Sequence, residues 1–238
     1  MKTVRYAIYF APPADDRLSQ TAARWLGRDA FTGETNELSA LGSLDAATRH
    51  ALTADPRRYG FHGTLKAPFT LAEDRSEAEL VAAFETFADN LEPFEIPQLT
   101  LLQLGPFFAL VSANHCEALQ EFAAQAVQTF EPFRAPLSDV DMARRNPDKL
   151  PERQREYLRK WGYPYVFEEF QFHLTLTGPV PGETAKPMRT VLESTFADHI
   201  GKPLHVTSVA LFVEPHRGAP FLVHSLLPLR GATQRKIA

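Results

Sequence analysis

The chain has 238 residues, of which 44% are hydrophobic and 23% charged, and its formal net charge is -4. This composition is typical of a globular protein, and the acidic balance argues against a long polyanion as partner, because nucleic-acid binders usually carry a basic excess. The single cysteine, Cys116, excludes an internal disulfide and a multi-cysteine zinc site. The first residues show no signal-peptide pattern, and the longest apolar stretch, 99–111, is too short to span a membrane. We therefore expect a cytoplasmic protein with no membrane partner.

The first half of the chain mixes strands and helices. Runs rich in β-branched and aromatic residues, bounded by turn residues, predict strands. These runs are 4–10, 59–67, 94–104 and 107–112. Apolar residues with a helical period predict helices at 15–26 and 77–90, and the run 44–52 is compatible with a short helix.

The second half repeats this order. The expected helices are 115–130 and 187–199, and the expected strands are 170–177, 204–213 and 221–229. Each half thus reads helix, strand, helix, strand, strand. This order predicts an α+β fold, one bilobal domain over 1–238, with pseudo-symmetric lobes of roughly 1–112 and 113–238. Each lobe would hold an antiparallel-type sheet with helices on its outer face, the two would share a central groove, and the chain could cross between them.

The stretch 131–168 interrupts the parallel between the halves. It contains a predicted helix at 151–161, and seven Lys and Arg residues lie between Ala143 and Lys160 against three acidic ones. Two interpretations stay open. The segment is a solvated surface helix, as most charge runs are, or it is a cap over the groove that supplies cations to a phosphate.

A short motif that occurs twice, 111 residues apart, is the most informative feature of the chain. The copies are 61–68 and 172–179, in which Phe, His, Thr, Leu and Pro recur in register. Successive side chains of a strand alternate between its faces. The residues that share one face are His62, Thr64 and Lys66 in the first copy and His173, Thr175 and Thr177 in the second. Two imidazoles and two hydroxyls on like strands predict a site for a small anion, with one histidine as base and the other as acid.

Three further residues are candidates for substrate binding. Lys66 could add charge at the anion, although its counterpart Thr177 shows that the symmetry does not require it. Arg58 precedes the first motif and could reach either the anion or the solvent. Tyr165 belongs to an aromatic run, 161–165, that could line the mouth of the site or fix the cap. The other histidines lack metal-ligand spacing, and the sequence has no P-loop and no dinucleotide fingerprint, so we expect neither metal nor cofactor.

Both copies fit the pattern H-x-[ST]-x, and at these residues the chain resembles the two-histidine (2H) phosphoesterase superfamily. The longer strings 58–69, 161–165 and 170–173 resemble an uncharacterised branch that is often encoded among phosphonate-utilisation (carbon–phosphorus lyase) genes. The resemblance implies metal-independent opening of cyclic phosphates or the reverse ligation. It implies His62 and His173 as acid and base, and Thr64 and Thr175 as phosphate ligands.

We therefore expect a hydrolase that opens a small cyclic phosphate or phosphodiester connected with phosphonate metabolism. One alternative is an enzyme acting on 2′,3′-cyclic ends of RNA, against which the acidic net charge counts. Another is a non-catalytic protein that binds a phosphorylated metabolite. The sequence leaves open the substrate, the direction of the reaction, the oligomeric state, and which histidine is the base.

Overall fold

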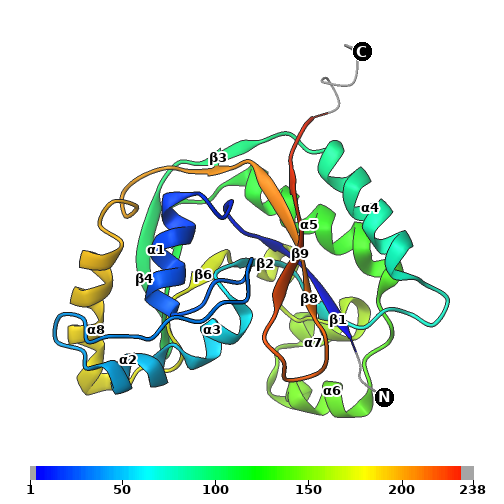
Figure 1. The fold of residues 1–238 in the computed structure, drawn as a ribbon. Helices are drawn as coiled ribbons and strands as arrows, with labels where there is room; N and C mark the ends of the chain where they lie inside the picture. The colour runs from blue at the N-terminus through cyan, green and yellow to red at the C-terminus, as the bar shows by residue number, and fades with distance from the viewer. Residues whose placement is uncertain (1–3, 232–238) are drawn as a thin grey trace.

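An antiparallel sheet forms the centre of the molecule in the computed structural model, which describes residues 4–231 (Figure 1). Its seven strands within these residues lie in the order β4-β5-β6-β2-β1-β8-β9. Their bounds are β1 Arg5–Phe10, β2 Gly63–Phe69, β4 Leu99–Leu104, β5 Phe107–Ser112, β6 His173–Thr175, β8 Ser208–Glu214 and β9 Leu222–Pro228. A separate pair joins β3 Phe94–Ile96 to β7 Leu204–Val206.

Helices flank both halves of this sheet. Figure 1 shows α1 and α8 beside the half that contains β4 and β6, and α4 and α5 beside the half that contains β8 and β9. The helices are α1 Arg17–Leu26, α2 Ala46–Leu52, α3 Ala54–Tyr59, α4 Glu77–Asp89, α5 Glu117–Phe130, α6 Asp139–Arg144, α7 Glu152–Trp161 and α8 Gly182–Thr195, with 3-10 turns η1 Glu131–Phe133, η2 Pro147–Lys149 and η3 Phe167–Glu169. The α+β class with antiparallel pairing is confirmed. None of the helices between residues 4 and 231 has the length and hydrophobicity that a membrane crossing requires.

Local sequence explains where several elements begin and end. Asp16 caps α1 through the amide of Leu18, and Ser76 and Glu79 form a reciprocal capping box at α4. The strand predicted from residue 59 begins only at Gly63, because α3 extends through Tyr59 and residues 60–62 connect it to β2. Pro56 lies in the first turn of α3, where a helix needs no amide hydrogen from it. The last helix also differs from prediction, because it begins at Gly182 and contains Pro187 in its interior.

The two motif strands are neighbours at the middle of the sheet. β2 and β6 run antiparallel, and Gly63 pairs with Leu174. On one side of this seam β1, β8 and β9 continue the sheet, and on the other side β5 and β4 do. Strands from both 1–112 and 113–238 thus lie in each half. The chain crosses between the halves, and the division at about residue 112 stays a prediction from the sequence.

The two faces of the sheet carry different clusters of side chains. On β1, Ile8 and Phe10 belong to the main core beneath the helices, whereas Tyr9 belongs to a smaller cluster on the opposite face. Phe212 of β8 and Phe221 lie in the same small cluster. This alternation follows from the two-residue period of strands. It leaves a face lined by aromatic rings beside the first histidine motif.

Candidate active site

The register at the central seam brings the two histidine motifs together. Because Gly63 pairs with Leu174 in an antiparallel ladder, His62 lies opposite Thr175, and Thr64 lies opposite His173. Side chains directly opposite one another in such a ladder have Cβ atoms about 4.5–5.5 Å apart. The four residues therefore form a locally two-fold arrangement of imidazoles and hydroxyls. His62, Thr64 and Thr175 line a pocket of about 310 Å³, whereas His173 is not among the residues that line it.

The backbone fixes both imidazoles in the same way. His62 Nδ1 lies 2.9 Å from the carbonyl oxygen of Gly60, and His173 Nδ1 lies 2.8 Å from that of Gln171. A carbonyl oxygen only accepts hydrogen bonds, so both Nδ1 atoms carry a proton and donate it. Each neutral ring then presents an unprotonated Nε2, and that of His62 lies 3.2 Å from Thr64 Oγ1. In each ring, Nε2 is therefore the nitrogen that does not bond to the backbone.

Aromatic rings surround His62. Its imidazole stacks on Tyr9, with ring centroids 3.9 Å apart and an interplanar angle of 26°. The ring centroids of Tyr59 and Phe212 lie 5.9 and 6.1 Å from that of His62. Burial among these rings lowers the pKa of His62 to about 4; the bond to Gly60 opposes this shift, and the charge of His173 adds to it. His62 is therefore neutral near pH 7.

His173 has fewer aromatic neighbours. Its side chain is half-buried, as that of His62 is, and its ring lies 5.8 Å from that of Phe107, which itself lines the pocket. The electrostatic effect of His173 on His62 is consistent with two rings that face one site. The two motifs therefore place equivalent groups in unequal surroundings.

Glycine is required at two positions around the first motif. Gly60 has φ +77°, and a Cβ there would lie 2.4 Å from Ala30 Cβ. At Gly63 a Cβ would lie 2.6 Å from the ring of Phe172. The second motif has Leu174 at the equivalent position. This asymmetry follows from the packing of the Phe172 ring against β2.

Lys66 does not reach the pocket, contrary to the expectation from strand alternation. Tyr9 pairs with Thr64, but Ile8, which precedes Tyr9 on β1, pairs with Lys66 instead of Leu65. Leu65 is therefore the extra residue of a β-bulge, which turns Lys66 to the helix-covered face. There Lys66 Nζ bonds to Glu131 at 2.8 Å and to the carbonyl oxygen of Val127 at 3.1 Å. Burial lowers the pKa of Lys66, and the bond to Glu131 opposes this shift.

Tyr165 also lies away from the pocket. Its side chain is exposed, and its ring meets that of Tyr163 edge to face at 5.5 Å. Tyr163 is the residue of this aromatic run that lines the pocket, together with Arg145. The aromatic run indicates that a ring could lie near the site, but a turn has no period from which the inward-facing ring could be chosen. Tyr9 carried no signal, because the pairing of β1 with β2 is not encoded locally.

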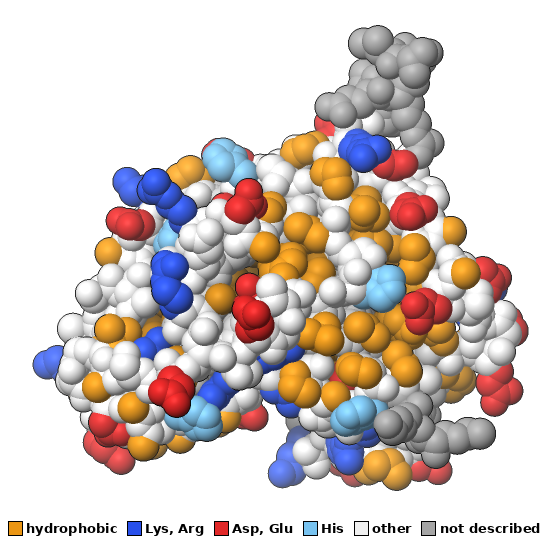
Figure 2. All heavy atoms as spheres, in the orientation of Figure 1, with side chains coloured by type: hydrophobic (Ala, Val, Ile, Leu, Met, Phe, Trp, Pro, Cys, Tyr) orange, Lys and Arg blue, Asp and Glu red, His pale blue; other side chains and the backbone are white. Residues whose placement is uncertain are grey.

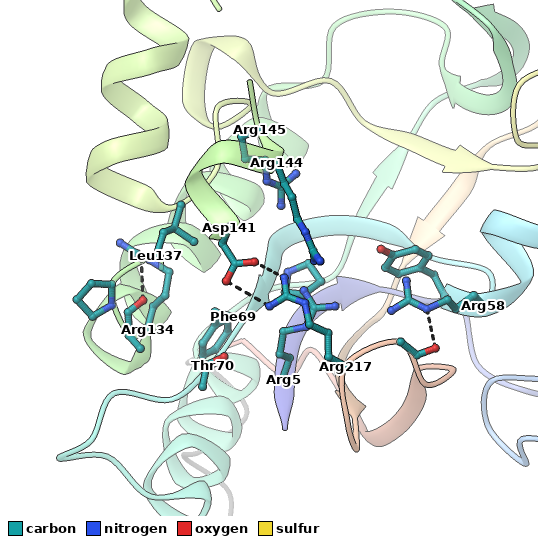
Figure 3. Close-up of a pocket in the computed structure, with 15 residues that line it drawn as sticks. Arg5, Arg58, Phe69, Thr70, Arg134, Leu137, Asp141, Arg144, Arg145 and Arg217 are labelled. Atoms are coloured by element: carbon teal, nitrogen blue, oxygen red, sulfur yellow. Dashed lines mark hydrogen bonds and ion pairs between the residues drawn. The ribbon is translucent and has the colours of Figure 1, made fainter. Parts of the chain in front are cut away.

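A second hollow, of about 580 Å³, adjoins the histidine pocket, and Arg58 lies in it (Figure 3). Arg58 bonds to Glu214, and its guanidinium lies 4.9 Å from the ring centroid of Tyr59. The arginines that line this hollow are Arg5, Arg58, Arg134, Arg144, Arg145 and Arg217. In Figure 2, basic side chains gather at the lower margin of the molecule, near α6. Between residues 4 and 231, no three His, Cys, Asp or Glu side chains are grouped as metal ligands.

Residues 64–222 match the family model described as "Protein of unknown function (DUF1045)". Two curated proteins named ribose 1,5-bisphosphate phosphokinase PhnN are similar along nearly the whole chain. The protein of Janthinobacterium sp. (strain Marseille) is 33% identical over 97% of this chain and 52% of its own length. The protein of Laribacter hongkongensis (strain HLHK9) is 35% identical over 98% of this chain and 54% of its own length. The chain thus spans about half the length of these relatives.

Several solved structures are similar at low identity. The Thermus thermophilus protein TT0787 has a TM-score of 0.44 and 18% identity, covering 96% of this chain and 99% of its own. LigT of E. coli complexed with phosphate has a TM-score of 0.43 and 11% identity, with the same two coverages.

Proposed function

Since this chain belongs to the DUF1045 family, whose description assigns no function, we propose an activity from the pocket itself. The protein is a metal-independent phosphoesterase that opens a small cyclic phosphate. The observation that carries this proposal is the pair of histidines at the seam of the sheet, each with Nδ1 bonded to a backbone carbonyl and Nε2 left to act. Paired imidazoles can move both protons of a hydrolysis without another group.

We base the assignment of the two roles on the unequal surroundings of the histidines. His62 is neutral near pH 7, because burial lowers its pKa to about 4, and it acts as the base. A water oxygen attacks phosphorus, and the water proton moves to His62 Nε2. The bond from phosphorus to one ring oxygen breaks, and protonated His173 gives that oxygen its proton. Thr64 and Thr175 donate hydrogen bonds to the phosphate oxygens, and proton exchange with solvent restores both histidines.

The names of the curated relatives suggest the substrate class. Those proteins are about twice as long and are named for a kinase of ribose 1,5-bisphosphate. This chain has no G-x-x-x-x-G-K-[ST] motif, so we assign the kinase to the remainder of those proteins. Opening a 1,2-cyclic phosphate of ribose 5-phosphate at O2 would yield ribose 1,5-bisphosphate. We propose this cyclic phosphate as the substrate, which also fits the resemblance to the phosphonate-linked branch.

An assay with three kinds of cyclic phosphate tests the proposal. The purified chain is incubated with the ribose 5-phosphate 1,2-cyclic phosphate, with 2′,3′-cyclic AMP and with RNA ending in a 2′,3′-cyclic phosphate, and phosphorus NMR follows ring opening. We expect the first substrate to be opened fastest, with a rate unchanged by EDTA. Preference for RNA would support the RNA-end alternative instead. Binding without ring opening would identify a non-catalytic binder.

A further inference from the structure

We propose that the arginine-lined hollow is a second phosphate subsite, which holds a terminal phosphate monoester of the substrate while the cyclic phosphate lies between His62 and His173. This inference rests on the proposed function. It deepens that function by requiring a substrate with two phosphate groups. The hollow measures about 580 Å³, which leaves room for a phosphate and its hydration.

Segments distant in the sequence deliver the arginines to this hollow (Figure 3). Arg5 comes from β1 and Arg58 from α3, whereas Arg217 comes from the loop between β8 and β9. Arg144 is the last residue of α6, and Arg145 follows it directly. Bringing like charges together costs free energy, so such a cluster indicates a site that an anion completes.

Carboxylates neutralise only part of this charge. Glu214 pairs with Arg5 and Arg58, Asp141 pairs with Arg217, and Glu131 pairs with Arg134. The six arginines therefore face three carboxylates, and Glu131 is also shared with Lys66. Arg144 and Arg145 form no ion pair within 4 Å of a carboxylate in the part of the chain that the structure describes, although the pKa of Asp141, which the bond to Arg217 lowers most, is also lowered by the charge of Arg144. A phosphate monoester dianion would supply the missing negative charge, and guanidinium groups bind such an anion with two parallel hydrogen bonds.

The subsite is continuous with the histidine pocket. Tyr59, Pro68 and Arg145 line both hollows. Arg145 also lies over the ring of Tyr163, 5.1 Å from its centroid, at the boundary between them. One small ligand can thus reach from the pocket lined by His62 and both motif threonines into the arginine cluster. A cyclic phosphate that lacks the terminal phosphate would occupy only the first hollow.

Arg144 offers the cleanest test, because it makes no ion pair with a carboxylate in the described residues. Arg144→Gln should lower the ratio of kcat/KM for ribose 5-phosphate 1,2-cyclic phosphate to that for 2′,3′-cyclic AMP by ~10–100-fold, the usual effect of one charged hydrogen bond. Arg159→Gln on the exposed surface of α7 removes the same charge outside the hollow and should leave the ratio unchanged. An unchanged ratio in Arg144→Gln, or an equal loss on both substrates, would overturn the subsite.

A binding measurement separates this inference from the proposed function. Calorimetry with the His62→Ala/His173→Ala double variant compares ribose 1,5-bisphosphate with ribose 1-phosphate and needs no turnover. We expect the bisphosphate to bind more tightly, and adding Arg144→Gln should remove ~10–100-fold of that preference. If the bisphosphate has no advantage, the subsite is wrong even where ring opening is observed. If the advantage is present but no cyclic phosphate is opened, the proposed function fails and the subsite stands.

Discussion

The two histidine motifs carry His and Thr at the same positions but place them in unequal surroundings. His62 lies within a cage of Tyr9, Tyr59 and Phe212, and burial lowers its pKa to about 4. His173 is half-buried beside Phe107. Two copies of one chemical group thus lie in different surroundings, and the proposed mechanism uses this difference to give each histidine its own role.

The largest expected effect comes from removing either imidazole. His62→Ala and His173→Ala should each lower turnover by ~10²–10⁴-fold, and the double variant should be little worse than the weaker single variant, because both groups act in one step. The pH profiles of kcat/KM sharpen the comparison. His62→Ala should remove the fall in activity on the acid side, which reports protonation of the base. Persistence of that fall in His62→Ala would contradict the assignment of His62 as the base.

Next in size is the effect of truncating the core face of the second motif. Phe172 is buried against Gly63 and Phe10, so Phe172→Ala should destabilise the fold by ~3–5 kcal/mol. Urea denaturation measures this loss, and His173→Ala on the opposite face is the matched control. Should His173→Ala prove the more destabilising of the two, the faces of the motif strands have been assigned in reverse.

The depressed pKa of His62 also makes stability depend on pH. The unfolded imidazole takes up a proton near pH 6.5, whereas the folded one does so near pH 4. Stability is thus complete above about pH 6.5 and falls as the pH is lowered towards 4, by up to ~3 kcal/mol from this residue. Unfolding free energies of the native chain and His62→Gln at pH 7 and pH 4.5 isolate the contribution. His115→Gln, at an exposed histidine, should behave like the native chain.

The smallest expected effect concerns Lys66. Lys66→Met removes an ion pair on the helix-covered face, while Arg134 still neutralises Glu131, so we expect a loss of ~1–3 kcal/mol in stability. The KM should change less than about twofold, because the ammonium does not line the pocket. The KM is measured with the native and variant chains in parallel. A tenfold rise would indicate that Lys66 binds the phosphate of the substrate, as the sequence predicts.

The sequence predicted those parts of the site that depend on local alternation. His and Thr of each motif share a face because each strand is regular over those three residues, and the order of helices and strands follows from their periodicities. The alternation fails at Lys66, because a bulge depends on how β1 pairs with β2 and leaves no mark in the strand itself. Tyr9 could not be predicted as a neighbour of His62 for the same reason, because its place beside the first motif depends on how β1 pairs with β2.

The arginine hollow was only partly visible in the sequence. The basic run within 131–168 is apparent in the sequence, and it includes Arg144 and Arg145. Most of its other basic residues lie on α7, outside the hollow. Arg5 and Arg217 reach the hollow through the pairing of β1 with β8, which joins residues more than two hundred positions apart. Such a cluster is a property of sheet order, and local patterns do not encode sheet order.

The bulge at Leu65 ties the histidine strand to the segment that bears the unpaired arginines. By turning Lys66 towards α5, it brings the ammonium to Glu131, and Glu131 also holds Arg134 at the root of the segment 131–168. One carboxylate thus anchors both β2 and the start of the chain that leads to Arg144. The bulge therefore connects the strand that bears Thr64 to Arg134, which lines the arginine hollow, through a single partly buried ion-pair cluster.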